Sequence, residues 1–225
     1  MRWLAILDMD GTLLERRTVD VLCEKLGLTE RLMEIDRKSK SMDAYEVSAE
    51  IAELFTGIEA SRLETIFDTI THVKGAKDFI NYLKSRDFVT AIVTDSYVFL
   101  ASKLAQKLDI DAVKGNMLEL VNGILTGKIT MPLGWEEEKQ KNCQRKAVCK
   151  LHAMNNLMKL YQIQDNKTLA VGDSQSDFCV IKKARVGIAF RPKDKSIIRA
   201  SDAVIRTDFH DLIEWLKDFL YNFDI

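Results

Sequence analysis

Aspartate side chains follow three short apolar segments of this 225-residue sequence. The polar residues at these positions are Asp8 and Asp10, then Thr94, Asp95 and Ser96, and finally Asp173 and Asp177. Carboxylates a few ångströms apart repel one another, so one of them must take up a proton unless a cation neutralises them. A hard divalent cation resolves this repulsion, and Mg²⁺ binds a few carboxylates while leaving room for water and phosphate. We therefore expect a Mg²⁺ site.

The first pair of aspartates has a spacing that suits covalent catalysis. Asp8 and Asp10 are two residues apart, which in extended backbone directs both side chains to one side. One carboxylate can then act as nucleophile, while the other exchanges a proton with the leaving group and with water. Gly11 lets the chain turn away sharply after the strand.

A parallel sheet must bring these residues together. Short apolar runs predict strands at residues 3–7, 88–93, 168–171 and 186–190, and more weakly at 202–205. Apolar residues at helical spacing predict helices at residues 75–86, 96–108, 146–161, 178–184 and 208–220. The alternation predicts an α/β fold around a mostly parallel sheet, which binds ligands at the carboxyl ends of its strands.

A long helical segment separates the first two strands. Helical patterns occupy residues 19–26, 29–37, 43–54 and 61–69. Such a stretch inside a compact domain indicates an inserted module, so we expect residues 17–73 to form a small helical cap on a core of residues 1–16 and 74–225. Residues 115–132, with Asn122-Gly123 at the centre, predict a β-hairpin. The charged run at 135–142 predicts a solvated loop or a helix start.

These motifs resemble those of the haloacid dehalogenase superfamily of phosphohydrolases, over essentially the whole chain. The resemblance implies a Rossmann-like fold in which Asp8 forms an aspartyl-phosphate and Asp10 is the general acid and base. It also implies that Thr94 binds the transferring phosphoryl group. The implied Mg²⁺ ligands are Asp8, the backbone carbonyl of Asp10, and Asp173, with Asp177 in the first or second coordination shell. Asp10 itself points to phosphoryl chemistry, because dehalogenase members lack it.

The family also uses a lysine that neutralises the nucleophile and the phosphate. Two candidates precede the predicted strand at 168–171, namely Lys150 and Lys146. We favour Lys150, because Met154 and Leu157 follow it at the spacing of the family's lysine-led helix. Lys146 stays open as the alternative, and a solvated helix lysine is the ordinary fate of either residue.

Within the superfamily the chain looks most like the phosphoserine phosphatase branch, but its substrate-recognising positions differ. Arg17 stands where that branch has a glutamate that binds the substrate ammonium, and no arginine lies near Ala52, where the branch has one for the carboxylate. A Ser-Gly-Gly motif is replaced by Thr94-Asp95-Ser96. We therefore expect phosphoserine to be a poor substrate. Arg17 either engages a second anionic group or is a surface arginine at the cap hinge, while Asp95 and Ser96 contact the substrate.

The composition excludes several other classes of protein. The formal net charge is -1, with 33 basic and 34 acidic side chains, so no basic excess exists for nucleic acid. No apolar run is long enough to span a membrane, and no secretion signal is recognisable, so we expect a cytoplasmic protein. The expected partner is a small-molecule phosphomonoester. The alternatives are a phosphotransferase or mutase, which would pass the phosphoryl group to an acceptor hydroxyl instead of water, and a catalytically silent binding module. Phosphate release without an added acceptor would distinguish a phosphatase from a phosphotransferase.

Overall fold

A computed structural model describes residues 2–132 and 148–222 of the chain. Its seven described strands form one sheet in the order β4-β3-β2-β1-β5-β6-β7. The strands are β1 (Trp3–Leu7), β2 (Phe88–Tyr97), β3 (Ala112–Val121), β4 (Ile124–Thr130), β5 (Thr168–Gly172), β6 (Val186–Phe190) and β7 (Ala203–Ile205). Every neighbouring pair is parallel except β3 and β4. The predicted α/β architecture with a mostly parallel sheet is confirmed.

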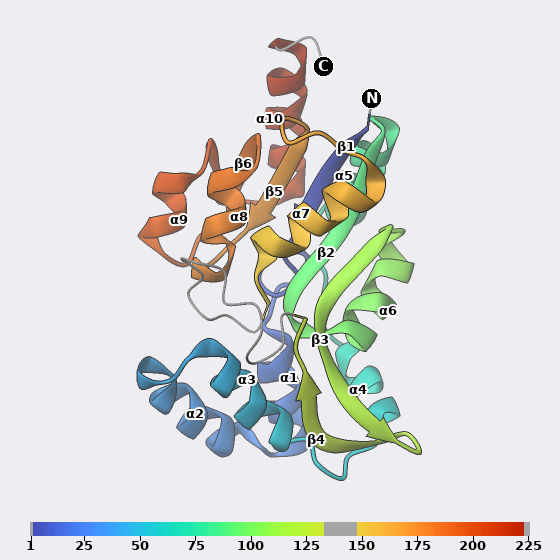
Figure 1. Ribbon diagram of the computed structural model, residues 1–225, viewed down its shortest axis with the longest axis vertical. Coiled ribbons are helices and arrows are strands. Elements are labelled where there is room, and N and C mark those ends of the chain that lie inside the picture. The colour runs from blue at the N-terminus through green and yellow to red at the C-terminus, as the bar shows by residue number, and fades with distance from the viewer. Residues whose placement is uncertain (1, 133–147, 223–225) are drawn as a thin grey trace.

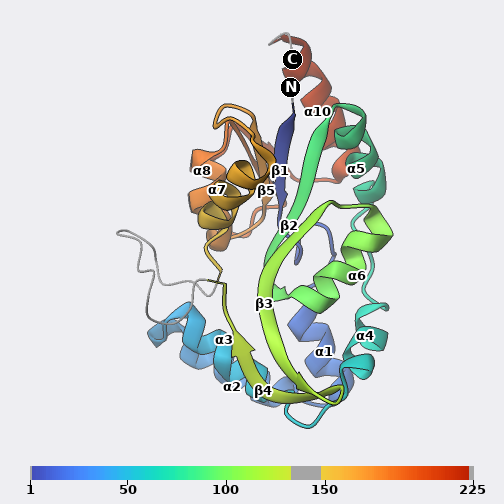
Figure 2. The same ribbon diagram turned by 45° about the vertical axis from the view of Figure 1, so that its right-hand side comes forward.

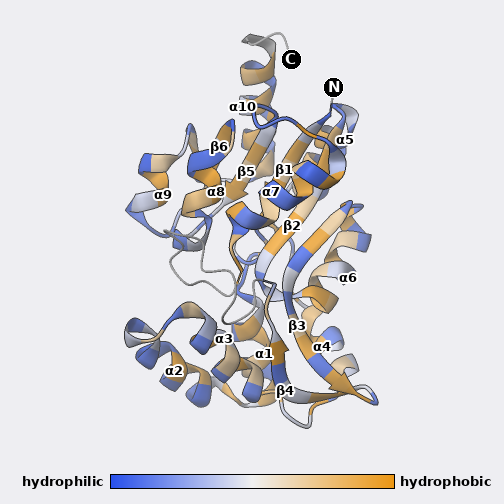
Figure 3. Ribbon diagram, viewed as in Figure 1, coloured by the Kyte–Doolittle hydropathy of each residue, from blue (hydrophilic) through white to orange (hydrophobic). Residues whose placement is uncertain are grey.

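Helices cover both faces of the sheet (Figure 1). One face carries α5 (Ala76–Ser85), α6 (Val98–Leu108) and α10 (Phe209–Asn222), and the other carries α7 (Lys150–Tyr161), α8 (Phe178–Lys183) and α9 (Lys195–Ala200). Successive side chains of β1 point to opposite faces of the sheet. Ala5 and Leu7 pack on the first side, and Leu4 and Ile6 pack on the second. Burial on both sides explains why the central strands are almost wholly apolar, as the colouring of β5 in Figure 3 illustrates.

Four α-helices and one 3-10 helix lie between β1 and α5. They are α1 (Thr18–Leu26), α2 (Thr29–Lys38), η1 (Ser39–Ser41), α3 (Ala44–Glu53) and α4 (Ala60–Phe67). Figures 1 and 2 both place these helices together at one end of the molecule, beyond the carboxyl ends of β1 and β2. Backbone hydrogen bonds tie them to the β3–β4 hairpin, because the amide of Gly57 donates to Leu125 O at 2.8 Å and that of Ala60 to Gly123 O at 2.9 Å.

The structure differs from the sequence predictions on one side of the sheet. β2 runs to Tyr97, so Asp95 and Ser96 belong to the strand and α6 begins only at Val98, two residues later than predicted. The predicted hairpin is present, but its first strand starts at Ala112 and also pairs in parallel with β2. Short runs such as 112–114 carry no apolar periodicity, so only tertiary pairing makes them a strand. The charged run at 135–142 lies outside the described residues.

None of the helices in the described part of the chain combines the length and apolar character that crossing a membrane requires.

Candidate active site

Three carboxylates and one ammonium group meet where β1 and β5 end. Nζ of Lys150 lies 2.5 Å from Oδ1 of Asp8 and 2.7 Å from Oδ1 of Asp177. All three residues are buried, and Lys150 is only 2% exposed. Carboxylate oxygens of Asp8, Asp173 and Asp177 lie within 4.8 Å of one another. Lys150 therefore compensates two buried negative charges that the strands and the following turn force together.

Local backbone structure fixes this cluster. Asp8 follows β1 directly, and its amide donates to Val171 O on the neighbouring strand β5 at 3.0 Å. Asp177 ends the 3-10 helix η2 (Gln175–Asp177), where its Oδ2 accepts from the amides of Asp173 and Ser174, both at 3.2 Å. Both oxygens of Asp177 are therefore engaged by the protein, one by Lys150 and the other by backbone amides.

Gly11 is required by the close approach of the turn after β1 to the acidic cluster. It adopts φ 82°, a left-handed conformation that side chains disfavour. A Cβ at this position would lie 2.1 Å from Oδ2 of Asp173, which is closer than any real contact. The glycine thus lets the two loops pack against each other.

A second lysine reaches the cluster from the loop after β6. Nζ of Lys193 lies 2.5 Å from Oδ2 of Asp173, while the Lys193 side chain is 60% exposed. The amide of Lys193 also donates to Asp173 O at 2.8 Å, which fixes the backbone there. Oxygen atoms of three buried carboxylates lie close together here, and this all-oxygen chemistry suits a hard divalent cation. The residues present therefore fit the metal that the sequence predicts.

Burial and mutual repulsion set the charges of this cluster. Burial raises the pKa of Asp8 well above its usual range against the opposing charge of Lys150, and the charges of the other two carboxylates raise it further. Burial likewise raises the pKa of Asp173, although Lys193 opposes it. Burial would lower the pKa of Lys150, but the nearby carboxylates outweigh that effect and raise it. Lys150 therefore stays charged at neutral pH. Its single positive charge does not offset the negative charge of all three carboxylates.

Asp10 lies beside this cluster but in a different environment. Its carboxylate accepts a hydrogen bond from the hydroxyl of Thr18 at 2.5 Å, and Thr18 begins α1. Burial raises the pKa of Asp10 to about 6, and the Thr18 hydrogen bonds limit the rise. A carboxyl group that titrates near neutral pH can both donate and accept a proton, as a general acid and base must.

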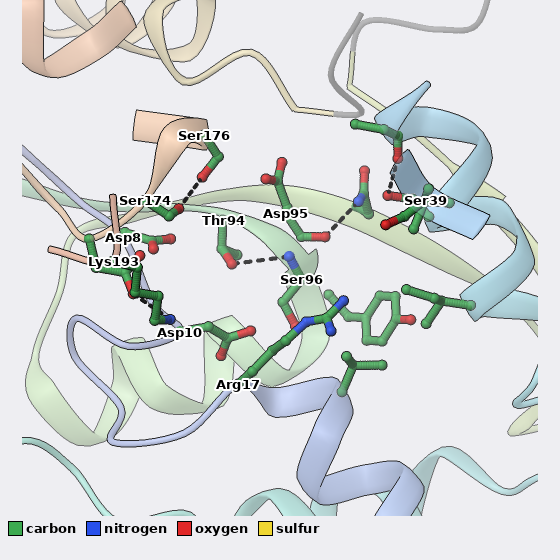
Figure 4. A pocket seen from close by; sticks show the side chains of 18 of the residues that line it. Asp8, Asp10, Arg17, Ser39, Thr94, Asp95, Ser96, Ser174, Ser176 and Lys193 are labelled. Carbon is green, nitrogen blue, oxygen red and sulfur yellow. Dashed lines mark hydrogen bonds and ion pairs between the residues drawn. The ribbon is translucent and has the colours of Figure 1, made fainter. Parts of the chain in front are cut away.

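The end of β2 contributes Thr94, which is predicted to bind the phosphoryl group, and Asp95 and Ser96, which are predicted to contact the substrate. Oγ1 of buried Thr94 accepts from the amide of Ser96 at 3.0 Å, which leaves its own O–H available to donate. The carbonyl of Asp95 accepts from Nδ2 of Asn116 at 2.7 Å, and Asn116 lies on the neighbouring strand β3. The close-up in Figure 4 shows Thr94, Asp95 and Ser96 in the middle of the site, with Asp8 and Asp10 close to Thr94 on one side.

A cavity of about 460 Å³ lies between these groups and the helices α1, η1 and α3. The predicted residues that line it are Asp8, Asp10, Arg17, Thr94, Asp95, Ser96 and Asp173. Lys150 and Asp177 lie behind Asp8 rather than on the cavity wall. Nη1 of Arg17 is 3.2 Å from carboxylate oxygens of both Asp20 and Asp36, so this guanidinium is already paired. Lys146 lies outside the described residues.

Several lining or supporting residues were not predicted as part of the site. They are Thr18, Asn116, Ser174, Ser176 and Lys193. Lys193 follows strand β6 by three residues, and the rule that parallel strands present their carboxyl ends at one edge would have identified it. Asn116 carried no such signal, because its nearness to Asp95 depends on the unpredicted pairing of β3 with β2.

Comparisons with known proteins agree with this architecture. Residues 5–182 match the sequence model of the haloacid dehalogenase-like hydrolase family. The chain is 30% identical over 220 residues to the phosphoserine phosphatase of Streptococcus thermophilus, covering 97% of each protein. A solved phospho-aspartyl intermediate analogue of phosphoserine phosphatase superimposes with a TM-score of 0.79 at 25% identity, over 95% of this chain and 98% of that one. A substrate-bound phosphoserine phosphatase complex gives 0.80 at 24% identity, over 96% and 98%, and shows the shared fold.

The chain therefore belongs to the haloacid dehalogenase-like hydrolases, in the phosphoserine phosphatase-like branch of phosphatases. The family resemblance inferred from Asp8, Asp10, Thr94 and Asp173 is thus confirmed.

Proposed function

We propose that the protein is a Mg²⁺-dependent phosphatase that hydrolyses a small-molecule phosphomonoester through an aspartyl-phosphate on Asp8. The observation that carries this proposal is the buried contact of Lys150 with Asp8 and Asp177 beside Asp173, directly behind the wall of a cavity large enough for a small substrate. The phosphatase relatives and the solved phospho-aspartyl analogue support the same chemistry. The departures at Arg17, Asp95 and Ser96 support a substrate other than phosphoserine.

The two aspartates of the first motif divide the reaction between them. A carboxylate oxygen of Asp8 attacks phosphorus while the bond from phosphorus to the leaving alcohol oxygen breaks, and Asp10 gives its proton to that oxygen. Asp10, now a carboxylate, takes a proton from water as the water oxygen attacks the aspartyl-phosphate. This second step releases inorganic phosphate and restores both side chains. A pKa of about 6 for Asp10 suits both directions of transfer.

The surrounding residues provide charge and position. Lys150 offsets the negative charge of Asp8 and Asp177, and the hydroxyl of Thr94 donates to a phosphoryl oxygen. Mg²⁺, when held by Asp8, the Asp10 carbonyl and Asp173, would neutralise the phosphate and the carboxylates together. Asp177 supports this set from outside by holding Lys150.

Residues 17–73 act in this proposal as a cap. Its helices supply the cavity wall opposite the strand ends, so its closure would exclude bulk water from the aspartyl-phosphate. The volume of about 460 Å³ suits a small molecule rather than a phosphorylated protein surface.

Metal removal tests the function directly. We expect the purified protein to release phosphate from p-nitrophenyl phosphate in the presence of Mg²⁺, and EDTA to reduce the rate at least ~100-fold, because the carboxylate cluster is then undercompensated. Mg²⁺ added in excess over EDTA should restore the rate. Full activity of the dialysed, EDTA-treated protein would contradict the proposed metal dependence.

Lys193 should compete with the metal. Its ammonium contacts Asp173 and is exposed enough to swing away, so a divalent cation must displace or repel it. We expect Lys193→Met to tighten Mg²⁺ binding about tenfold, or ~1.4 kcal/mol, measured by isothermal titration calorimetry on the metal-free protein. Lys195→Met, which removes an exposed lysine from the same loop and helix start, is the matched control and should leave the affinity unchanged. Equal or weaker binding by Lys193→Met would show that Lys193 does not oppose the metal.

A further inference from the structure

Arg17 lines the substrate cavity, and its single positive charge is in contact with two carboxylates of the protein. Nη1 of Arg17 lies 3.2 Å from Oδ2 of Asp36 on α2 and 3.2 Å from Oδ1 of Asp20 on α1. Its distance to the other oxygen of Asp36 is 3.3 Å. One guanidinium thus faces two carboxylates. An incoming substrate carboxylate would meet a group of net negative charge at this end of the cavity.

No other lining cation in the described part of the chain is available to a second anionic group. Lys193 also lines the cavity, but its ammonium contacts Asp173 at the phosphate end. Asp95 adds a further carboxylate to the cavity wall, next to the residue that binds the phosphate. Charge complementarity therefore opposes a substrate whose alcohol part carries an anion, because like charges brought together in the cavity repel each other.

The remaining wall is apolar with isolated hydrogen-bonding groups. Val19 and Ile51 are buried, and the half-buried Met42 and Val47 line the same cavity. Asn116 is fully buried, and its Nδ2 donates to the carbonyl of Asp95, which leaves Oδ1 as an acceptor without a hydrogen-bond partner among the described residues. A buried acceptor of this kind favours a ligand that brings a hydroxyl or amino donor.

We propose that the cavity selects phosphomonoesters of small alcohols that carry no carboxylate, and that the pairing of Arg17 with Asp36 and Asp20 sets this selectivity. The inference rests on the proposed phosphatase function and specifies its substrate class. It replaces the expectation from the sequence that Arg17 binds a second anionic group of the substrate, because the structure supplies that arginine with anions from the protein itself.

Two matched pairs of compounds isolate the effect of a carboxylate. O-phosphoethanolamine differs from O-phosphoserine only by the carboxylate, and glycerol 3-phosphate differs from 3-phosphoglycerate by the oxidation of one alcohol. Each compound is added at increasing concentration while the hydrolysis of p-nitrophenyl phosphate with Mg²⁺ is followed. Even a slowly hydrolysed compound then gives an inhibition constant. We expect the carboxylate-free member to compete at least about tenfold better in both pairs, which corresponds to ~1.4 kcal/mol.

A substitution in the charge cluster then tests its cause. Asp36→Asn removes one of the two carboxylates that contact Arg17. In each pair, the ratio of the inhibition constant of the carboxylated compound to that of its partner should therefore fall about three- to tenfold. The matched control is Asp68→Asn, which removes a carboxylate of similar exposure from a surface pair with Lys103 and Lys107 at the end of α4. This control should leave both ratios unchanged.

The possible outcomes separate the inference from the function on which it rests. A carboxylated compound that competes as well as its partner in either pair would overturn the inference, as would failure of all four compounds to compete. An Asp36→Asn variant with unchanged ratios would overturn the role given to the Arg17 cluster. Absence of any p-nitrophenyl phosphate hydrolysis with Mg²⁺ would instead overturn the proposed phosphatase chemistry, whichever compound binds.

Discussion

Replacing Asp8 with asparagine is expected to lower kcat for phosphate release at least ~10⁴-fold, because a carboxamide has nearly the shape of a carboxylate but is not a nucleophile. The backbone of residue 8 would keep its position beside β5, since its amide donates to Val171 O. The cluster would lose one negative charge, so the repulsion among its carboxylates would weaken. Steady-state kinetics with p-nitrophenyl phosphate and Mg²⁺ measures the loss.

Asp87→Asn is a suitable control for this substitution. Asp87 is an exposed carboxylate that follows α5 and pairs with Arg2, and asparagine tolerates its positive φ of 58°. Its kcat should stay within about twofold of the wild type, in line with the small effects of exposed pairs. If Asp8→Asn kept more than ~1% of the wild-type kcat while folding normally, another group would have to be the nucleophile.

Removing the buried lysine is expected to affect both activity and stability. Lys150→Met would leave the carboxylates of Asp8 and Asp177 without the ammonium that contacts both. We expect kcat to fall ~10³-fold, the size of a lost electrostatic stabiliser in a buried site. We also expect the free energy of unfolding at pH 8 to fall by about 3–5 kcal/mol, as when one partner of a buried ion pair is removed.

The stability loss in Lys150→Met should depend on pH in a defined direction. The folded pKa of Asp8 is already raised above the value of about 3.9 expected in the unfolded chain. Loss of Lys150 removes a charge that lowers it, so the folded protein binds the proton more readily still. A raised carboxyl pKa costs stability as pH rises through the interval between the unfolded and folded values. The variant should therefore come closer to the wild type at pH 5 than at pH 8.

Urea unfolding of the metal-free proteins at both pH values measures this difference. Lys159→Met is the matched control, because Lys159 is an exposed lysine on the same helix α7. It should change the free energy of unfolding by less than about 0.5 kcal/mol at either pH. An equal loss at pH 5 and pH 8 in Lys150→Met would mean that lost packing, rather than uncompensated carboxylates, destabilises the variant.

The local sequence pattern was sufficient to predict those strands and helices whose structure depends mainly on their own residues. The central strands β1, β5 and β6 are short apolar runs with polar residues directly after them, and β1 and β6 have the predicted bounds. The four helices between β1 and α5 begin and end within two residues of the predicted bounds. Because parallel strands align their carboxyl ends, Asp8, Thr94 and Asp173 were identified as neighbours although they are far apart in the chain.

Features that depend on the packing of separate segments could not be predicted. The pairing of Arg17 with Asp36 requires α1 and α2 to pack at a particular angle, and nothing in either helix specifies that angle alone. The contact of Asn116 with Asp95 requires β3 to join the sheet beside β2. For the same reason the charge balance of the cavity, and with it the expected substrate class, became clear only from the folded structure.

The most direct test of the proposed chemistry is to trap the phosphorylated enzyme. Borohydride reduces an acyl phosphate to the alcohol, so an aspartyl-phosphate formed during turnover of p-nitrophenyl phosphate with Mg²⁺ would become homoserine. Peptide mass spectrometry of the quenched protein then locates the modified residue. The proposal predicts homoserine at position 8, dependent on substrate and absent from Asp8→Asn. Homoserine at another aspartate, or none under conditions where reduction is complete and phosphate is being released, would contradict it.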